Sequence, residues 1–312
     1  MRLCVVVAAS ALATGVACAA GGLGQDHPLT GRIWDVAAAR FITSDVLVGR
    51  LAATRFILLG ERHDNSGHHV AQAAIVRGVA ATGRRPTVAF EMLGADQAAA
   101  LAAYLKTSPG DAAGLGEAVG WSRSGWPPWP LYQPIADAAL AAGLPLAAAN
   151  LPEGTVRAVA RGNIDVLDPG LVRTHGLDRP AAPAIQAAME AEMRESHCGQ
   201  LPETALPAMV RAQRARDAAM AERLLAASGD GAVLIAGAGH VRTDRGVPIY
   251  LAARAPGAAI ASVAFVEVAT GYDAPMEYAK RFGGARLPFD YVWFTGRADD
   301  VDHCAAFRRT RD

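Results

Sequence analysis

The sequence predicts an α/β protein with a mostly parallel central sheet that is flanked by helices and carries a helical insert or cap. Apolar runs of strand length recur along the chain, and helical patterns separate them. Runs that are apolar at nearly every position suit strands buried on both faces, which is typical of parallel sheets. The chain has 312 residues, of which 52% are hydrophobic and 19% charged, so it can build a large core.

The predicted elements follow one another along the chain. Strands are predicted at 55–60, 86–92, 144–150, 232–240, 258–268 and 290–295. Helical patterns at 69–82 and 95–106 follow the first two strands. A longer helical region, at about 152–228, lies between the third and fourth strands, and its Met and Ala spacing indicates packed helices. We expect one domain over 31–296 and a C-terminal tail over 297–312.

The segment 120–134 is rich in Trp and Pro, "GWSRSGWPPWPLYQP". Proline lacks a backbone donor, so this composition argues against a helix or a central strand. We expect a loop folded across a sheet edge or over a site. Its aromatic side chains could line an apolar slot for a ligand, although ordinary packing is the favoured explanation.

The N-terminus has the form of an export signal. Arg2 precedes the apolar run 3–16, which is too short to span a bilayer comfortably. The small residues at 17–19 fit signal cleavage, which makes 1–19 a signal peptide; lipid attachment at Cys18, as in a bacterial lipoprotein, and an uncleaved N-terminal anchor are the alternatives. Cleavage or lipidation places the chain in the periplasm or on the outer membrane, with the membrane reached only through a lipid anchor.

Two cysteines lie outside the signal segment, Cys198 and Cys304. An oxidising compartment permits a disulfide between them, and two unpaired buried thiols are the alternative. The formal net charge is zero, and no Lys/Arg run forms a basic stripe. This composition excludes nucleic acid as the expected partner.

Polar residues gather where the predicted strands end. Glu61 and His63 follow the first strand, Glu91 closes the second, Asn150 the third and His240 the fourth. Ligands of open α/β sheets bind outside the carboxyl ends of the strands, so we expect these five side chains on one rim. Convergent titratable groups of this kind are typical of functional sites, although each residue alone has a structural explanation as a helix cap or an ion pair.

The chemistry of this rim is open between two classes. Glu61, His63, Glu91 and His240 supply the oxygen and nitrogen ligands of a divalent metal ion. The same residues suit general acid–base catalysis without a metal. Of the adjacent His68 and His69, only one can face Glu61. No H-E-x-x-H, G-x-S-x-G or G-x-G-x-x-G motif is present.

Several motifs resemble the ChaN-like family of haem-binding uptake proteins, which is related to the TIKI, TraB and erythromycin-esterase group. These motifs are "LLGERHDNSGHHVAQ", "VAFEML" followed by "DQ", "ESHCGQLP", "AQRARDAAMA" at 212–221 and "GAGHVRTDRGVP" at 237–248. They occur in the family's order, and the resemblance spans about 31–268.

The resemblance implies an exported protein of iron or haem acquisition that binds haem as a homodimer through a tyrosine. The esterase relatives imply a hydrolytic site at Glu61, His63, Glu91 and His240. The tyrosine does not align to a motif, so it stays open among Tyr132, Tyr250, Tyr272, Tyr278 and Tyr291.

Two hypotheses about function follow. The first is an exported haem- or iron-binding uptake protein, with His69, Tyr132, Asn150 and Arg242 as candidate cofactor-binding residues. The alternative is a hydrolase acting on an ester, lactone or peptide bond. Arg214 and Asp217, on a predicted helix, either support the rim from behind or form a salt-bridged face.

Overall fold

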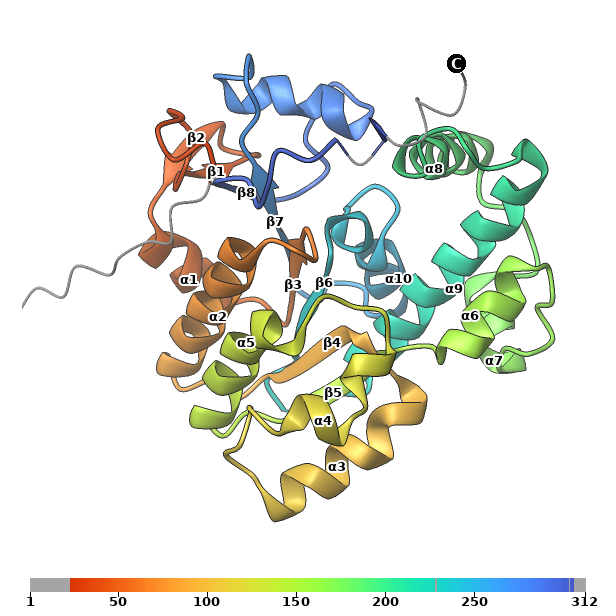
Figure 1. The fold of residues 1–312 in the computed structure, drawn as a ribbon, viewed down its shortest axis with the longest axis horizontal. Helices are drawn as coiled ribbons and strands as arrows, with labels where there is room; N and C mark the ends of the chain where they lie inside the picture. Colours follow the sequence, from red (N-terminus) through yellow and green to blue (C-terminus); the bar gives the residue numbers. More distant parts are fainter. Residues whose placement is uncertain (1–22, 228, 303, 306–312) are drawn as a thin grey trace, which may run out of the picture.

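The computed structural model describes residues 23–227, 229–302 and 304–305, so the predicted export signal lies outside the described residues. Within them, eight strands form one sheet in the order β2-β1-β8-β7-β3-β6-β4-β5 (Figure 1). The strands are β1 (Ile33–Asp35), β2 (Arg40–Ile42), β3 (Phe56–Glu61), β4 (Thr87–Gly94), β5 (Leu146–Asn150), β6 (Ala232–Gly237), β7 (Ile260–Glu267) and β8 (Tyr291–Thr295). Every pairing from β8 to β5 is parallel, which confirms the predicted fold class.

The six strands predicted from apolar runs are all present. β3 and β6 are buried at every position, as expected for central strands with helices on both faces. The additional strands β1 and β2 pair antiparallel at one edge of the sheet. Each has three residues, too few for an alternating pattern to identify in the sequence.

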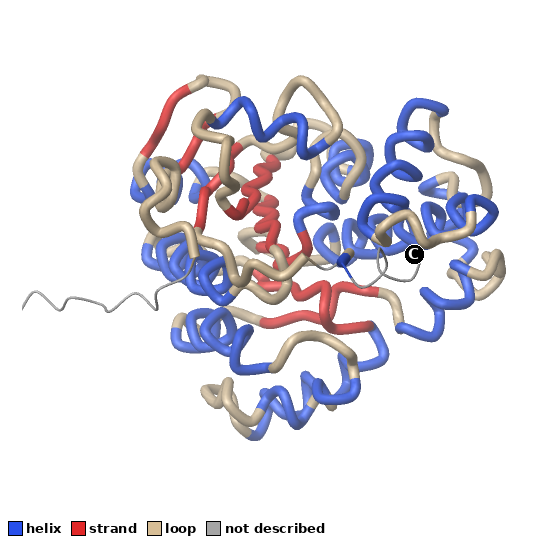
Figure 2. The backbone as a smooth tube through the Cα atoms, turned by 45° about the horizontal axis from the view of Figure 1, so that its top comes forward, coloured by secondary structure: helices blue, strands red, loops and turns tan. Residues whose placement is uncertain are grey.

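Helices cover both faces of the sheet (Figure 2). One core packs α1 (Ser44–Ala52), α2 (Ser66–Ala81) and α5 (Trp129–Ala141) against one face. The other core packs α9 (Leu206–Leu225) and α10 (Val247–Arg254) against the opposite face. The two cores divide the strands by alternation, so that successive residues of β3 point to opposite faces. Below β4 and β5 in Figure 1 lie α3 (Ala98–Thr107) and α4 (Leu115–Ala118), and short 3-10 turns, η1 (Ala95–Gln97) and η2 (Trp121–Arg123), flank them.

The predicted helical region at 152–228 is observed. It contains α6 (Glu153–Ala160), α7 (Pro169–His175), α8 (Pro183–Ser196), η3 (Glu203–Ala205) and α9. In Figure 1 these helices form a group beside the sheet. After β6 the chain makes the turn η4 (Ala238–Val241), and η5 (Pro275–Phe282) precedes β8.

The prediction of a loop over all of 120–134 was wrong at its C-terminal end, where α5 begins at Trp129. Pro130 lies in the first turn of α5, where a backbone N–H has no acceptor within the helix, so the N–H that proline lacks is not missed by any hydrogen bond of the helix. Pro134 lies further inside the helix, and the burial of Tyr132 and Ile135 against the core holds the helix around it. Tertiary packing therefore outweighs the unfavourable composition.

Two further findings concern the cysteines and the helices. Cys198 and Cys304 are joined by a disulfide, so the first of the two alternatives for these thiols is the one observed. None of the helices in the described ranges has the length and apolar character that crossing a membrane requires.

Candidate functional site

The carboxyl ends of the parallel strands bring the predicted rim residues together. Glu61 ends β3, Glu91 lies near the end of β4, and His240 lies in η4, directly after β6. His63 and Glu91 meet above Gly237, since a Cβ built on this glycine would lie 2.9 Å from His63 Nε2 and 3.7 Å from Glu91 Oε2. The rim therefore forms two adjacent clusters with Gly237 between them.

The first cluster is centred on the buried carboxylate of Glu61. Its Oε1 lies 3.0 Å from His63 Nδ1 and accepts a hydrogen bond of 2.9 Å from the Tyr132 hydroxyl. Its Oε2 lies 3.1 Å from His69 Nε2, at ion-pair distance but without the alignment of a hydrogen bond. Burial alone would raise the pKa of Glu61, but the His63 and His69 side chains lower it below its usual value. Glu61 is thus ionised.

The two adjacent histidines of α2 point in different directions, as the sequence predicted. His69 faces Glu61, and its ring lies 4.2 Å from that of Tyr132, centroid to centroid. His68 Nδ1 accepts the backbone N–H of Arg62, and its Nε2 lies 2.8 Å from the Thr295 hydroxyl. Burial lowers the pKa of His68 to about 3, so this imidazole is neutral and fixes the chain after β3.

The second cluster is centred on Glu91, which is also buried. Its Oε1 pairs with the Arg216 guanidinium and lies 3.2 Å from His240 Nε2, while its Oε2 accepts the Gly237 N–H at 2.7 Å. Burial would raise the pKa of Glu91, but the positive charges of His240 and Arg216 hold it well below its usual range.

His240 lies between two carboxylates. Its Nδ1 is 2.5 Å from Asp217 Oδ1, on the side opposite Glu91. Burial would lower the pKa of His240, but Glu91 and Asp217 raise it to about 9. His240 therefore carries a proton at neutral pH, which suits it to donate a proton or a hydrogen bond and prevents it from acting as a general base.

Helix α9 supplies three side chains to this cluster. Asp217 orients His240, as the sequence hypothesis allowed. Arg216 and Gln213 were not predicted; Gln213 Nε2 lies 3.2 Å from both ring nitrogens of His240. Gln213, Arg216 and Asp217 are spaced i, i+3 and i+4, which places them on one face of a helix, and this spacing was the only available signal in the sequence. Arg214, by contrast, donates to the carbonyl oxygens of Gly176 and Arg179 beyond the end of α7, away from the rim.

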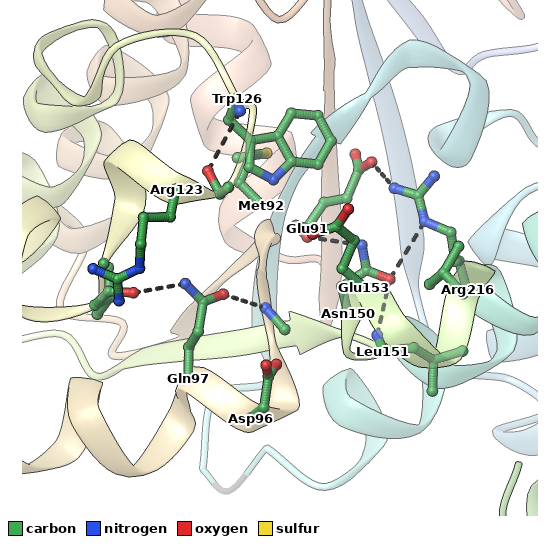
Figure 3. Close-up of a pocket in the computed structure, with 15 residues that line it drawn as sticks. Glu91, Met92, Asp96, Gln97, Arg123, Trp126, Asn150, Leu151, Glu153 and Arg216 are labelled. Atoms are coloured by element: carbon green, nitrogen blue, oxygen red, sulfur yellow. Dashed lines mark hydrogen bonds and ion pairs between the residues drawn. The ribbon is translucent and has the colours of Figure 1, made fainter. Parts of the chain in front are cut away.

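A cavity of about 380 Å³ opens beside the second cluster (Figure 3). Met92, Val119, Trp126, Leu151 and Val156 form its apolar lining. Its polar lining is formed by Glu91, Asp96, Gln97, Arg123, Ser124, Asn150, Glu153 and Arg216. In Figure 3, Trp126 lies above Glu91. Arg216 lies to the right of Asn150 in the same view.

The candidate cofactor-binding residues are distributed over three places. Asn150 lines the cavity and donates from Nδ2 to the Glu91 carbonyl oxygen at 3.0 Å. Tyr132 and His69 are fully buried behind Glu61, where no ligand reaches them in this conformation. Arg242 pairs with Asp244 and lines a separate cavity between α8 and η5, because the chain turns away from the rim after His240.

The divalent metal site expected from Glu61, His63, Glu91 and His240 is not found in the described residues and stays a prediction. The described residues contain no group of three or more His, Cys, Asp or Glu side chains arranged to hold a metal ion. The carboxylates of Glu61 and Glu91 are instead each engaged by their own imidazole and other partners.

A family model described as "Haem-binding uptake, Tiki superfamily, ChaN" matches residues 47–251, about two thirds of the chain. The chain belongs to this family. The solved structure of ChaN from Campylobacter jejuni, which shows cofacial haem binding to that protein, matches with a TM-score of 0.67 and 20% identity over 84% of this chain and 95% of that chain. At that identity the likeness shows the fold alone, and it agrees with the α/β architecture described above.

Two other solved structures are more distant. The type III effector HopBA1 matches with a TM-score of 0.42 and 13% identity, over 80% of this chain and 91% of that chain. A mutant of the erythromycin esterase EreC in its open conformation matches with a TM-score of 0.42 and 14% identity, over 85% of this chain and 81% of that chain. A search of curated proteins finds no match.

Proposed function

We propose that this protein binds haem and serves in haem or iron uptake outside the cytoplasm. The match of the haem-binding uptake family to residues 47–251 carries the proposal. The disulfide between Cys198 and Cys304 supports an exported location, because disulfides persist in oxidising compartments. The apolar run at 3–16 supports it independently, and lipidation at Cys18 would anchor the protein to a membrane.

The cavity beside Glu91 has features that suit a haem edge. Haem needs an apolar slot and a cation for its propionates, besides an axial ligand. Met92 and Trp126 supply apolar surface, and the exposed guanidinium of Arg123 lies at the mouth. Bound haem would supply a ferric iron for transport, while these residues would hold the ring and exclude water.

The tyrosines differ in their ability to act as the axial ligand. Tyr132, Tyr250 and Tyr278 are buried, and burial raises the pKa of each phenol, which disfavours a phenolate. Tyr272 and Tyr291 are partly exposed. The Tyr291 hydroxyl accepts a hydrogen bond of 3.4 Å from the Arg50 guanidinium, whereas Tyr272 has the guanidinium of Arg281 5.9 Å from its ring centroid. We infer that Tyr272 is the axial ligand, in a homodimer that encloses the haem.

A hemin titration of the purified chain tests this proposal. We expect a saturable Soret shift at one haem per chain, together with a dimer in size-exclusion chromatography. Tyr272→Phe should abolish the tyrosinate charge-transfer band, and Tyr104→Phe, whose hydroxyl bonds Asp111 on the surface, is the matched control. A wild-type protein that shows no saturable Soret shift would refute haem binding, and an unchanged spectrum in Tyr272→Phe would refute only the ligand.

The alternative hydrolytic role stays a prediction. The protonated His240 would serve there as an acid, and the ionised Glu61 or Glu91 would have to serve as the base.

A further inference from the structure

Helix α8 is weakly held by its own packing. Of its 14 residues only Met189 is buried. Its polar contacts to the rest of the chain include Glu192 with the buried Arg245 at 2.7 Å and the exposed pair of Arg194 with Glu203 at 2.7 Å. An exposed ion pair contributes little, and helices of this length are marginal on their own. Apolar burial therefore contributes little to holding α8 against the rest of the protein.

The position of α8 gives it access to the rim. A Cβ built on Gly239, directly before His240, would lie 3.3 Å from Glu192 Oε1. A cavity of about 380 Å³ lies between α8, the turn η4 and η5, and Ala191, Gly239 and Phe282 contribute to its lining. Helix α8 thus covers the outer side of the turn that carries His240.

A covalent bond fixes the end of this helix. Cys198 lies two residues after α8 and is joined to Cys304, 106 residues further on. Figure 1 shows the end of the described chain, in dark blue, beside α8. The segment before Cys304 is itself held at the rim, since Asp299 pairs with Arg62 at 2.8 Å and the Ala298 N–H donates to Glu267 at 2.8 Å.

The backbone at Cys198 forms the end of α8. Cys198 has φ of 58°, in the left-handed region, which is unfavourable for a residue with a Cβ but common just after a helix. The Gly199 N–H donates to the Arg194 carbonyl oxygen at 2.8 Å and closes this turn. The disulfide therefore joins the closing turn of α8 to the segment that pairs with Arg62.

We propose that the Cys198–Cys304 disulfide is a redox latch that holds α8 over the Ala238–Val241 turn, and that a dithiol reductant of the thioredoxin-like class releases it. Both cysteines are half-buried, so a reductant can reach them. In the reaction the S–S bond breaks, the two sulfurs gain two electrons and two protons, and the reductant leaves as its own disulfide. Release leaves α8 with one buried side chain and uncovers the turn beside His240.

Hydrogen exchange followed by mass spectrometry tests the latch on the full chain, without haem. Peptides covering 183–196 are compared before and after treatment with dithiothreitol, and a non-reducing peptide map first verifies the linked peptides around Cys198 and Cys304. Reduction should raise amide exchange in α8 at least about tenfold, because a disulfide across a long loop strongly constrains the opened chain. Exchange in β3 and β6, at the centre of the sheet, should stay unchanged.

Two controls separate the latch from other effects. The double variant Cys198→Ser/Cys304→Ser should exchange as fast as the reduced protein and should not respond to dithiothreitol. Glu203→Gln removes an ion pair of α8 but keeps the disulfide, so its exchange should remain close to that of the oxidised protein. Equal exchange of α8 in the oxidised and reduced wild-type protein, or a map without linked peptides, would overturn the proposal. Reduction of the wild type decides the outcome even if the double variant does not fold.

Discussion

The protonated state of His240 gives a sharp prediction for Asp217→Asn. The carboxylate of Asp217, 2.5 Å from Nδ1, and that of Glu91, 3.2 Å from Nε2, together raise the pKa of His240 to about 9. An amide at position 217 keeps the size of the side chain but loses its charge. We therefore expect the pKa of His240 to fall, because one of the two negative charges that stabilise its protonated form is lost.

The same pKa predicts how stability depends on pH. The folded-state pKa of His240 is higher than its unfolded value of 6.5, so its contribution is fully present below pH 6.5 and is lost as the pH rises through 9. The difference corresponds to about 3 kcal/mol of unfolding free energy. The pKa of His63 is also raised, because its interaction with Glu61 outweighs the effect of burial. His63 therefore also stabilises the folded state below pH 6.5, and this stabilisation is lost as the pH rises above that value.

Two measurements check this prediction. The His240 pKa is read from the pH titration of its ring signals in NMR, assigned by His240→Gln. The unfolding free energy is read from urea denaturation between pH 6 and pH 10. We expect wild type to lose stability over this range and Asp217→Asn to lose less, whereas Asp178→Asn, at an exposed position, should follow wild type. A His240 pKa below 7 in wild type, or identical pH profiles for wild type and Asp217→Asn, would refute the reasoning.

Two further predictions concern the first cluster. Gly237→Ala places a Cβ 2.9 Å from His63 Nε2, so the ring must shift, and urea denaturation should show a loss of about 1–3 kcal/mol. Gly154→Ala, where the new methyl meets no atom within 4 Å, should show no loss, and equal behaviour of the two variants would contradict the contact. Tyr132→Phe removes the hydroxyl that donates to Glu61 and should cost about 1–2 kcal/mol in the same assay, and a fully stable variant would show that this bond is dispensable.

The strands were predictable because burial on both faces leaves long apolar runs in the sequence. β3 and β6 are such runs, and their ends are correctly located to within a few residues. β1 and β2 were not predictable, since each has only three residues and β1 also depends on its pairing with the distant β8. Helix α5 was misjudged because the core that stabilises it around Pro134 comes from elsewhere in the chain.

The candidate site was predictable where it follows from strand topology. Glu61, Glu91 and His240 meet because parallel strands end at the same edge. The partners were harder to predict. Arg216 is one of several charged residues on the long helix α9, and only the crossing of α9 behind β4 brings it to Glu91. The metal hypothesis rests on residue types that suit a metal, but the partners that engage Glu61 and Glu91 in the structure were not visible in the sequence.

The charge balance of the rim restricts how a ligand can bind there. Glu91 and Asp217 are opposed by Arg216 and a protonated His240, so this buried network is close to neutral. A charged ligand that entered it would have to displace one of these partners and leave a buried charge unpaired, which is costly. Binding beside the network, against Met92 and Trp126, avoids that cost. A large apolar ligand with peripheral charges, such as haem, meets this condition better than a small anion or a bare metal ion does.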